Sequence, residues 1–302
     1  MTTVAEKTRT GPPEPVLATP HIGRRRLSWW IWGLVGAFVL VGVVHFMVTT
    51  PGWQWDLVGE YLFKEEILRG VVNTIWLTLL SAVTGLLAGG VVAYLRMSEN
   101  PALKAAGTVF IWLMRAIPAL VVLLFIFFLG ALVPQLTIGI PFTDIVFFSV
   151  KTNDVINKFT AALIGLTLIQ AAYVGEIYRA GILSVPKAQY EAAGAIGMTK
   201  ARAMRRIIMP QAIRVIIPPL SNELITLFKS TSLVSVIGFT ELLTSVQLVY
   251  GRTYQTIPML LVACLWYLVL TSIAMVGQSA LERHYSRGFV RRSKLKAPEV
   301  PA

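Results

Sequence analysis

The chain has 302 residues, of which 55% are hydrophobic and only 14% are charged, and its formal net charge is +12. Soluble domains carry about 25% charged residues, so this composition excludes an ordinary soluble domain and indicates a membrane protein. The basic excess does not indicate nucleic acid, because the basic residues lie in short segments between apolar runs and form no face interleaved with aromatic residues.

The N-terminal part begins with residues 1–27, which are rich in Pro and Thr and are predicted to be a disordered cytoplasmic tail. An uncharged run from about Trp29 to Val48 follows three arginines and is long enough to cross about 30 Å of hydrocarbon. A signal peptide also starts with basic residues, but this run is longer than a signal core, and no small-x-small cleavage site follows it. We therefore predict a retained transmembrane helix at 28–49.

Five further apolar runs predict transmembrane helices at about 70–95, 105–133, 159–178, 215–237 and 258–281. The run at 105–133 is interrupted by Arg115 and Pro118. Gly85 and Gly89 form a small-xxx-small pair that would let another helix approach closely. Segments 51–69 and 134–158 are predicted to be outside loops, the second longer than a simple connection needs, and 283–302 is a basic cytoplasmic tail.

The distribution of basic residues gives the orientation. The segments placed inside hold twenty Lys and Arg residues, whereas the segments placed outside hold five. Short loops rich in Lys and Arg stay in the cytoplasm. The sequence thus predicts a multi-pass protein of the cytoplasmic (plasma) membrane with both termini in the cytoplasm.

A polar, basic stretch separates the fourth and fifth predicted spans, QYEAAGAIGMTKARAMRRIIMPQAIRVIIPP at 189–219. Residues 190–196 form a short run of good helix formers that Gly197 breaks. Thr199 is placed to cap a second helix through Met209, which Pro210 should stop or kink. The result is a compact helix–turn–helix with an Ala-rich surface suited to docking into a groove.

The spacing in this stretch resembles the EAA loop of ABC-importer permeases, the cytoplasmic element that couples the membrane subunit to its ATPase. The matching positions are Glu191, Ala192, Ala193, Gly197, Ile207, Met209 and Pro210, with Met209 where the family usually has Leu. Segments such as NTIWLTLLSAVTGLLAGG and AAYVGEIYRAGILSVPKAQYEAAGAIGM resemble the polar-amino-acid branch (His, Gln, Glu or Arg type) of these permeases. Together the matches cover roughly residues 71–282.

This resemblance implies an all-α polytopic membrane protein: a five-helix type I permease core at 70–282, with its EAA loop at 187–212, plus one extra N-terminal helix. It implies the permease subunit of an ATP-driven, binding-protein-dependent importer of polar amino acids. The implied partners are an ABC ATPase dimer, a second permease (the same or a homologous chain) and a solute-binding protein. Two departures leave the substrate open, since 115–118 reads RAIP and 229–233 reads KSTSL where many members have RGTP and KDTSL.

Polar residues inside the predicted spans are candidates for the substrate pathway, because a zwitterionic amino acid needs a cation for its carboxylate and acceptors for its ammonium. The candidates are Gln170, Tyr173, Asn222, Thr226, Lys229, Ser230 and Arg115. Those on the fifth span share a helix face. The alternative to a pathway role is that these polar side chains form hydrogen bonds between helices. Glu176 and Arg179 are expected to form a local ion pair.

A secondary transporter or channel remains an alternative function, because Glu176, Glu223, Arg115 and Lys229 lie in or beside predicted spans. The internal repeats common in such folds are not found. No Gly-Lys pair and therefore no phosphate-binding loop is present, and no catalytic motif supports an enzyme. We expect no catalytic residue, cofactor or metal in this chain, with ATP and Mg bound by the partner ATPase. The lone Cys264 and three scattered histidines agree with this expectation.

Overall fold

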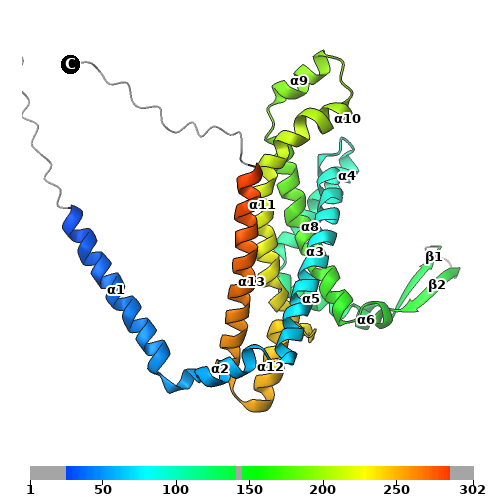
Figure 1. Ribbon diagram of the computed structural model, residues 1–302. Coiled ribbons are helices and arrows are strands. Elements are labelled where there is room, and N and C mark those ends of the chain that lie inside the picture. The colour runs from blue at the N-terminus through cyan, green and yellow to red at the C-terminus, as the bar shows by residue number, and fades with distance from the viewer. Residues whose placement is uncertain (1–24, 141–144, 286–302) are drawn as a thin grey trace, which may run out of the picture. The chain divides into compact units, whose positions relative to one another are not determined.

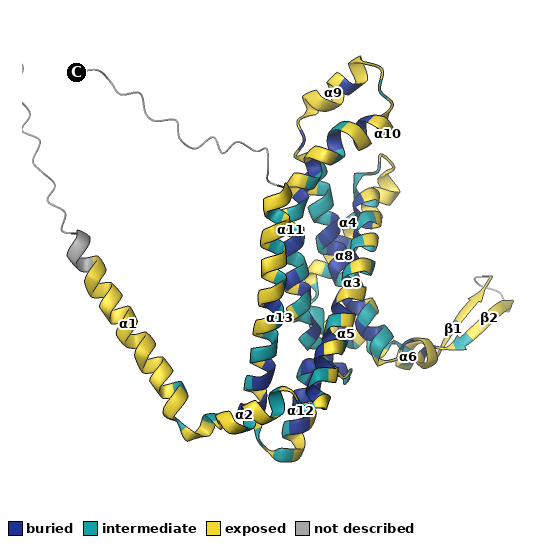
Figure 2. Ribbon diagram, viewed as in Figure 1, coloured by how far each residue is buried: buried dark blue, intermediate teal, exposed yellow. Residues whose placement is uncertain are grey.

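The computed structural model describes residues 25–140 and 145–285, and the chain divides into two units, Met1–Trp53 and Gln54–Ala302, each described by itself. The first unit contains helix α1 (Arg25–Thr49) and the short helix η1 (Pro51–Trp53). The predicted N-terminal span is thus helical, and its most apolar 18-residue stretch has no buried residue. Figure 2 shows α1 almost entirely exposed from Trp29 onward.

The second unit is a helical bundle with a small hairpin (Figure 1). Its elements are α2 (Trp55–Leu62), α3 (Glu65–Met97), α4 (Pro101–Ala116), α5 (Ala119–Phe127), α6 (Leu129–Leu132), β1 (Gln135–Gly139), β2 (Val146–Lys151), α7 (Thr152–Val155), α8 (Lys158–Leu183), α9 (Lys187–Ala195), α10 (Lys200–Ala203), η2 (Met204–Ile208), α11 (Met209–Ser230), η3 (Thr231–Ile237), α12 (Leu242–Thr253) and α13 (Thr256–Tyr285).

Helices α3 and α8 form the centre of the bundle, and small residues let them approach closely. A β-carbon on Gly89 would lie 2.5 Å from Cγ1 of Val174, and one on Gly85 would lie 2.5 Å from Cγ of Gln170. Glycine is therefore needed at both positions because any side chain would collide with α8, and not because the backbone requires an unusual conformation there. This confirms the close approach predicted from the Gly85–Gly89 pair.

The described helices account for the predicted spans by length and composition. Four of them, α1, α3, α8 and α13, are each long and apolar enough to cross a membrane, and two bent pairs raise the number to six if each pair is one span. The predicted third span is one of these pairs, because α4 and α5 meet at 103°. Ile117 is extended there, as the residue before a proline usually is, so Pro118 ends α4 and the chain turns.

The predicted fifth span differs at its start. We expected Pro210 to stop or kink the second helix of the 189–219 stretch. The helix does not stop, because helical turns continue from Lys200 through α10, η2 and α11. It does kink, since Figure 1 shows α10 lying at an angle to α11. The turn η2 is a π-helix, whose wider winding lies just before Pro210. Pro210 follows this π turn directly, and the kink accommodates its missing backbone donor.

The segment 134–158, predicted to be an outside loop, also contains structure that the sequence analysis did not predict. Strands β1 and β2 pair antiparallel, with Leu136 opposite Val150 and Ile138 opposite Phe148. The hairpin leads through α7 into α8, which Asn157 caps by accepting hydrogen bonds from the backbone of Phe159 and Thr160.

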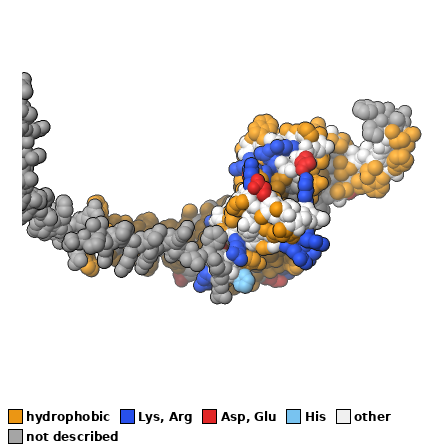
Figure 3. Space-filling model, turned by 90° about the horizontal axis from the view of Figure 1, so that it is seen from above, with side chains coloured by type: hydrophobic (Ala, Val, Ile, Leu, Met, Phe, Trp, Pro, Cys, Tyr) orange, Lys and Arg blue, Asp and Glu red, His pale blue; other side chains and the backbone are white. Residues whose placement is uncertain are grey.

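The two ends of the bundle carry different elements (Figure 1). At one end α9 and α10 lie beside the α3–α4 turn, where Lys200 Nζ is 3.2 Å from Glu99 Oε1. At the other end Arg252 of α12 pairs with Glu66 at 2.7 Å. Figure 3 looks onto the α9–α10 end, where Lys and Arg side chains gather. The basic loops therefore share one end of the bundle.

Candidate functional site

The turn between α9 and α10 is built on Gly197. Its φ of 73° is left-handed, and the amides of Gly197 and Met198 donate to the carbonyls of Gly194 and Ala193 at 2.9 and 3.0 Å. This pair of hydrogen bonds is a Schellman motif, which satisfies the last carbonyls of a helix. Thr199 then caps α10 by accepting from the amide of Arg202. The helix–turn–helix predicted at 189–219, with Gly197 as its turn and Thr199 as its cap, is confirmed.

The outward surface of α9 differs from the expected one. Ala193 is 1% exposed because it faces inward on the same side as Tyr190, whose hydroxyl donates to the carbonyl of Ile182. The residues that face outward are Glu191, Ala192 and Ile196, and Ile196 is 74% exposed. Ala193 therefore supports the loop from inside and cannot itself enter a groove on another protein. The sequence analysis missed Ile196, although the spacing of Tyr190 and Ala193 already defines the opposite face.

The remaining EAA positions lie where the loop meets the bundle. Ile207 and Met209 are half-buried and Pro210 is exposed, while Ile208 between them is fully buried. A small apolar cluster holds this region, with Ile208, Ala212 and Ile216 packed on Val185 at the end of α8. The loop is thus fixed to both α8 and α11.

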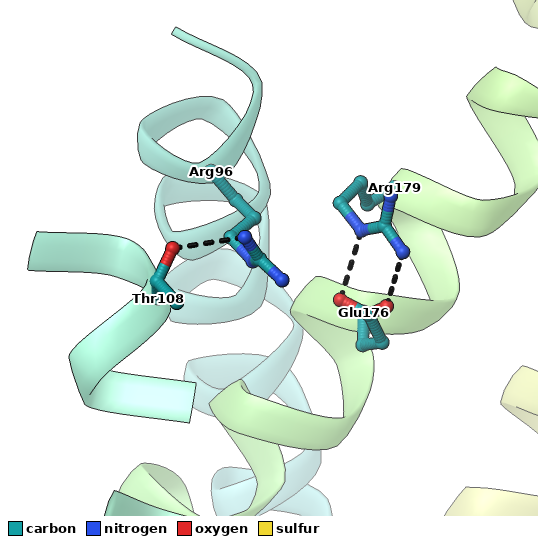
Figure 4. Close-up of polar contacts among 4 residues, drawn as sticks. All are labelled: Arg96, Thr108, Glu176 and Arg179. Carbon is teal, nitrogen blue, oxygen red and sulfur yellow. Dashed lines mark hydrogen bonds and ion pairs between the residues drawn. The ribbon is translucent and has the colours of Figure 1, made fainter. Parts of the chain in front are cut away.

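A second group of functional candidates surrounds a cavity of about 270 Å³ between α4, α8 and α11. Arg115, Tyr173 and Glu176 line it, and the Arg115 guanidinium lies 5.3 Å from the centre of the Tyr173 ring. Glu176 accepts from both Nε and Nη2 of Arg179, with Nε at 2.9 Å, which confirms the expected local ion pair. Figure 4 shows this pair opposite Arg96, which donates to Thr108.

The polar stripe of α11 continues from this cavity. Asn222, Thr226 and Lys229 are all exposed and follow Pro219, which lines the cavity, on one face of the helix. The hydroxyls of Thr226 and Ser230 donate to carbonyls of their own helix, those of Asn222 and Thr226, at 3.1 and 2.9 Å. Lys229 makes no ion pair with any residue in the described part of the chain. An exposed charged and polar stripe on a transmembrane helix requires a polar environment or a protein partner.

Prolines within α11 add acceptors beside the cavity. Pro218 and Pro219 lie inside the helix and donate no hydrogen bond, so the carbonyls four residues earlier, at Arg214 and Val215, lose their helical donors. Val215 lines the cavity together with Pro219. The cavity therefore combines a guanidinium with carboxylate and carbonyl oxygens.

Gln170 does not join this group. It is 2% exposed and packs between α3 and α8 against Gly85, and its Nε2 atom has no hydrogen-bond partner among the described residues. The structure thus brings Arg115 and Tyr173 to one cavity, with the α11 stripe beginning on the same helix face as its lining residue Pro219, and it places Gln170 inside the α3–α8 helix pair.

The structure also reveals a buried carboxylate that the sequence analysis missed. Glu241 is fully buried and caps α12, accepting from the amides of Leu243 and Thr244 at 2.9 and 2.7 Å and from the hydroxyl of Tyr267 at 2.8 Å. These bonds join α12 to α13. The signal was the sequence Phe-Thr-Glu-Leu-Leu-Thr after Gly238, in which an acidic residue precedes an apolar run, as at a helix start.

This architecture is a bundle of helices long and apolar enough to span a membrane, with a helix–turn–helix loop at one end and a polar face along α11. The family described as "Binding-protein-dependent transport system inner membrane component" matches residues 82–287, more than half of the chain. The chain belongs to this family, and it is a multi-pass membrane protein and a permease subunit of an ABC importer.

Relatives and solved structures agree. The chain is 40% identical over 291 residues to the arginine transport system permease protein ArgU of Corynebacterium glutamicum, covering 93% of this chain and 87% of the relative. It is 36% identical to the L-cystine transport system permease protein TcyB of Bacillus subtilis, with 77% and 92% covered. A crystal structure of an amino acid ABC transporter with histidines is similar with a TM-score of 0.61 and 34% identity, covering 72% and 94%. The confirmed fold is the type I permease core predicted from the sequence.

Proposed function

We propose that this permease moves polar amino acids, and that the cavity at Arg115 and the α11 stripe form its translocation pathway. The observation that carries the proposal is the exposed row of Asn222, Thr226 and Lys229 beside that cavity. Arg115 supplies a cation for an α-carboxylate, and the carbonyl of Val215 supplies an acceptor for an α-ammonium. The names of ArgU and TcyB, both amino acid permeases, support the substrate class.

The proposed assembly contains a second permease, the same chain or a homologue, facing the α11 stripe. An ABC ATPase dimer binds the outward surface of α9, formed by Glu191, Ala192 and Ile196. The chain itself has no phosphate-binding loop, so ATP and Mg are bound by that partner. A solute-binding protein delivers the amino acid at the opposite end, where α2 and α12 lie. A secondary transporter or channel finds no support in the family or the fold.

The test of the proposed function is substrate-stimulated ATP hydrolysis by the assembled complex in proteoliposomes. With the binding protein present, we expect one or a few polar amino acids to stimulate hydrolysis and to accumulate in the vesicles. Sugars and apolar amino acids serve as controls. Stimulation by a sugar alone would contradict the substrate class but leave the permease fold intact.

One prediction concerns Lys229. We expect Lys229→Met to lower uptake at limiting substrate by roughly 10-fold to 100-fold, because a charged hydrogen-bonding group contributes about 1.5–3 kcal/mol. Co-purification of the ATPase should not change, since Lys229 lies far along α11 from the coupling loop. Lys151→Met, at an exposed lysine of β2, is the matched control. Normal uptake by Lys229→Met would return the stripe to a structural role.

A second prediction concerns orientation. The α9–α10 end collects the basic loops, so we propose that it faces the cytoplasm together with both termini. A reporter fused after Met198 should be cytoplasmic, and one fused after Gly139 should be outside. Finding both reporters on the same side would show that the proposed layout is wrong.

A further inference from the structure

An apolar groove of about 610 Å³ lies on the side of the bundle away from the proposed pathway. Four helices form its walls: α3 with Ala93 and Met97, α8 with Tyr178, α11 with Ile213, and α13 with Tyr285. Met204 and Met209 of the coupling segment close it at the α9–α10 end. The groove-lining residues of α11 lie on the face roughly opposite Pro219 and Asn222.

The groove opens onto a lipid-facing surface. Val83, Leu87 and Val91 of α3 are spaced by four residues and are 56%, 70% and 58% exposed. The same row reaches the groove at Tyr94, which is 71% exposed and lines it. A continuous apolar row on a transmembrane helix contacts hydrocarbon. An acyl chain can therefore enter the groove directly from the bilayer.

The mouth of the groove is basic. An adjoining cavity of about 440 Å³ shares Ile217 and Tyr285 with the groove, and its charged lining residues are Arg214, Arg283 and Glu282, two cations against one carboxylate. Arg214 makes no ion pair with any residue that the structure describes. Arg283 uses only Nε, on the carbonyl of Ser279 at 3.0 Å, and nearby Glu282 is held by Gln278 at 2.8 Å.

The sequence after α13 is also basic. Beyond Tyr285 the chain continues with Arg287, Arg291, Arg292, Lys294 and Lys296. A cluster of basic residues directly after a transmembrane helix is the sequence pattern that attracts anionic lipids of the cytoplasmic leaflet. An apolar groove with a basic mouth therefore has the chemistry of an anionic phospholipid and not of a free phosphate, which would leave the groove empty.

We propose that this groove is a binding site for an anionic phospholipid from the leaflet on the α9–α10 side. One acyl chain lies between α3, α11 and α13, and the headgroup phosphate contacts Arg214 and Arg283. The bound lipid also contacts Met204 and Met209, so it links the coupling segment to the end of α13. This role does not depend on which solute the permease moves.

The test measures lipid retained by the purified full chain. The chain is exposed in mild detergent to equal amounts of phosphatidylglycerol and phosphatidylcholine, and bound lipid is counted by native mass spectrometry. We expect preferential retention of phosphatidylglycerol. Arg214→Gln and Arg283→Gln should each weaken it about fivefold, and together about 25-fold. The matched control is Lys104→Gln, an exposed lysine on α4 outside the groove, which should retain lipid normally.

A second variant tests the acyl part of the site. A β-carbon on Gly90, which lines the groove, would lie 4.0 Å from Cε2 of Tyr178, so Gly90→Leu fits and fills the groove. It should abolish retention, whereas Gly277→Leu, on α13 in open space, should not. Equal retention of both lipids, or normal retention by Gly90→Leu and the double arginine variant, would overturn the proposal. In the assembled permease–ATPase complex, the same Gly90→Leu substitution should change bound lipid and leave the subunits in place; loss of a subunit with unchanged lipid would also overturn the proposal, since the occupant would then be a protein.

Discussion

Gly197→Asp is expected to reach the membrane at near-normal levels, lose most of the co-purifying ATPase and lose transport. The φ of 73° disfavours most residues, but Asp tolerates this region, and nothing lies within 4 Å of the new β-carbon. The chain itself should therefore fold. The loss comes from a charge at the proposed contact, which typically costs about 2–5 kcal/mol, or roughly a thirtyfold to several-thousandfold weaker association.

Gly197→Asn separates charge from backbone conformation. Asn adopts positive φ as readily as Asp and has nearly the same shape, so it should keep most of the ATPase. Pull-down of the ATPase from detergent extracts compares the two variants directly. If Gly197→Asp kept both the ATPase and full uptake, the α9–α10 loop would not be the coupling element, while membership of the permease family would stand.

The second large effect is expected at Gly89. In Gly89→Val, the new β-carbon would lie 2.5 and 2.7 Å from Cγ1 and Cβ of Val174 and 3.1 Å from the backbone nitrogen of Gly175. Because a backbone atom is among these neighbours, α3 and α8 must separate. We expect destabilisation by about 3 kcal/mol and little folded protein on size-exclusion chromatography.

Gly90→Val is the matched control for this prediction, since it makes the same change one residue later. Replacing glycine by valine changes the helix propensity equally in the two variants, and only at Gly89 is there no room for the new side chain. Gly90→Val should therefore unfold within a few degrees of the natural chain in a thermal melt. Equal destabilisation by the two would mean that propensity, and not the α3–α8 contact, determines the effect.

The spans and the α9–α10 helix–turn–helix could be predicted because both depend on local signals. A span can be recognised from the length of its apolar run alone. The cap at Thr199 and the turn at Gly197 are likewise determined by residues within a few positions in the sequence. The detail at Pro210 was predicted only in part. Pro210 was expected to stop or kink the helix, and the helix continues with a kink at the π turn before Pro210. Ile208 of that turn packs in one cluster with Val185, and sequence spacing does not reveal this packing.

The candidate site was only partly predictable, because the faces of its helices are decided by packing partners. Ala193 is a small residue of the kind expected at a contact surface, and Gln170 is a polar residue of the kind expected in a pathway, yet both are buried. Ala193 lies on the side of α9 that the hydrogen bond from Tyr190 to Ile182 holds against the bundle. Gln170 packs against Gly85 of α3. The α11 stripe was predicted well, since its residues share a face whatever lies beside them.

The helix α11 has a mechanical consequence. Its 22 residues at about 1.5 Å each span roughly 33 Å, so a tilt of about 5° at one end would displace the other end by about 3 Å. In the proposed assembly, a movement of the α9–α10 loop would therefore reach Lys229 along helical turns and not through a flexible connection. Two successive backbone donors are missing from this helix at Pro218 and Pro219, beside the cavity. Any bending of α11 during transport would therefore be concentrated next to the residues that line the proposed pathway.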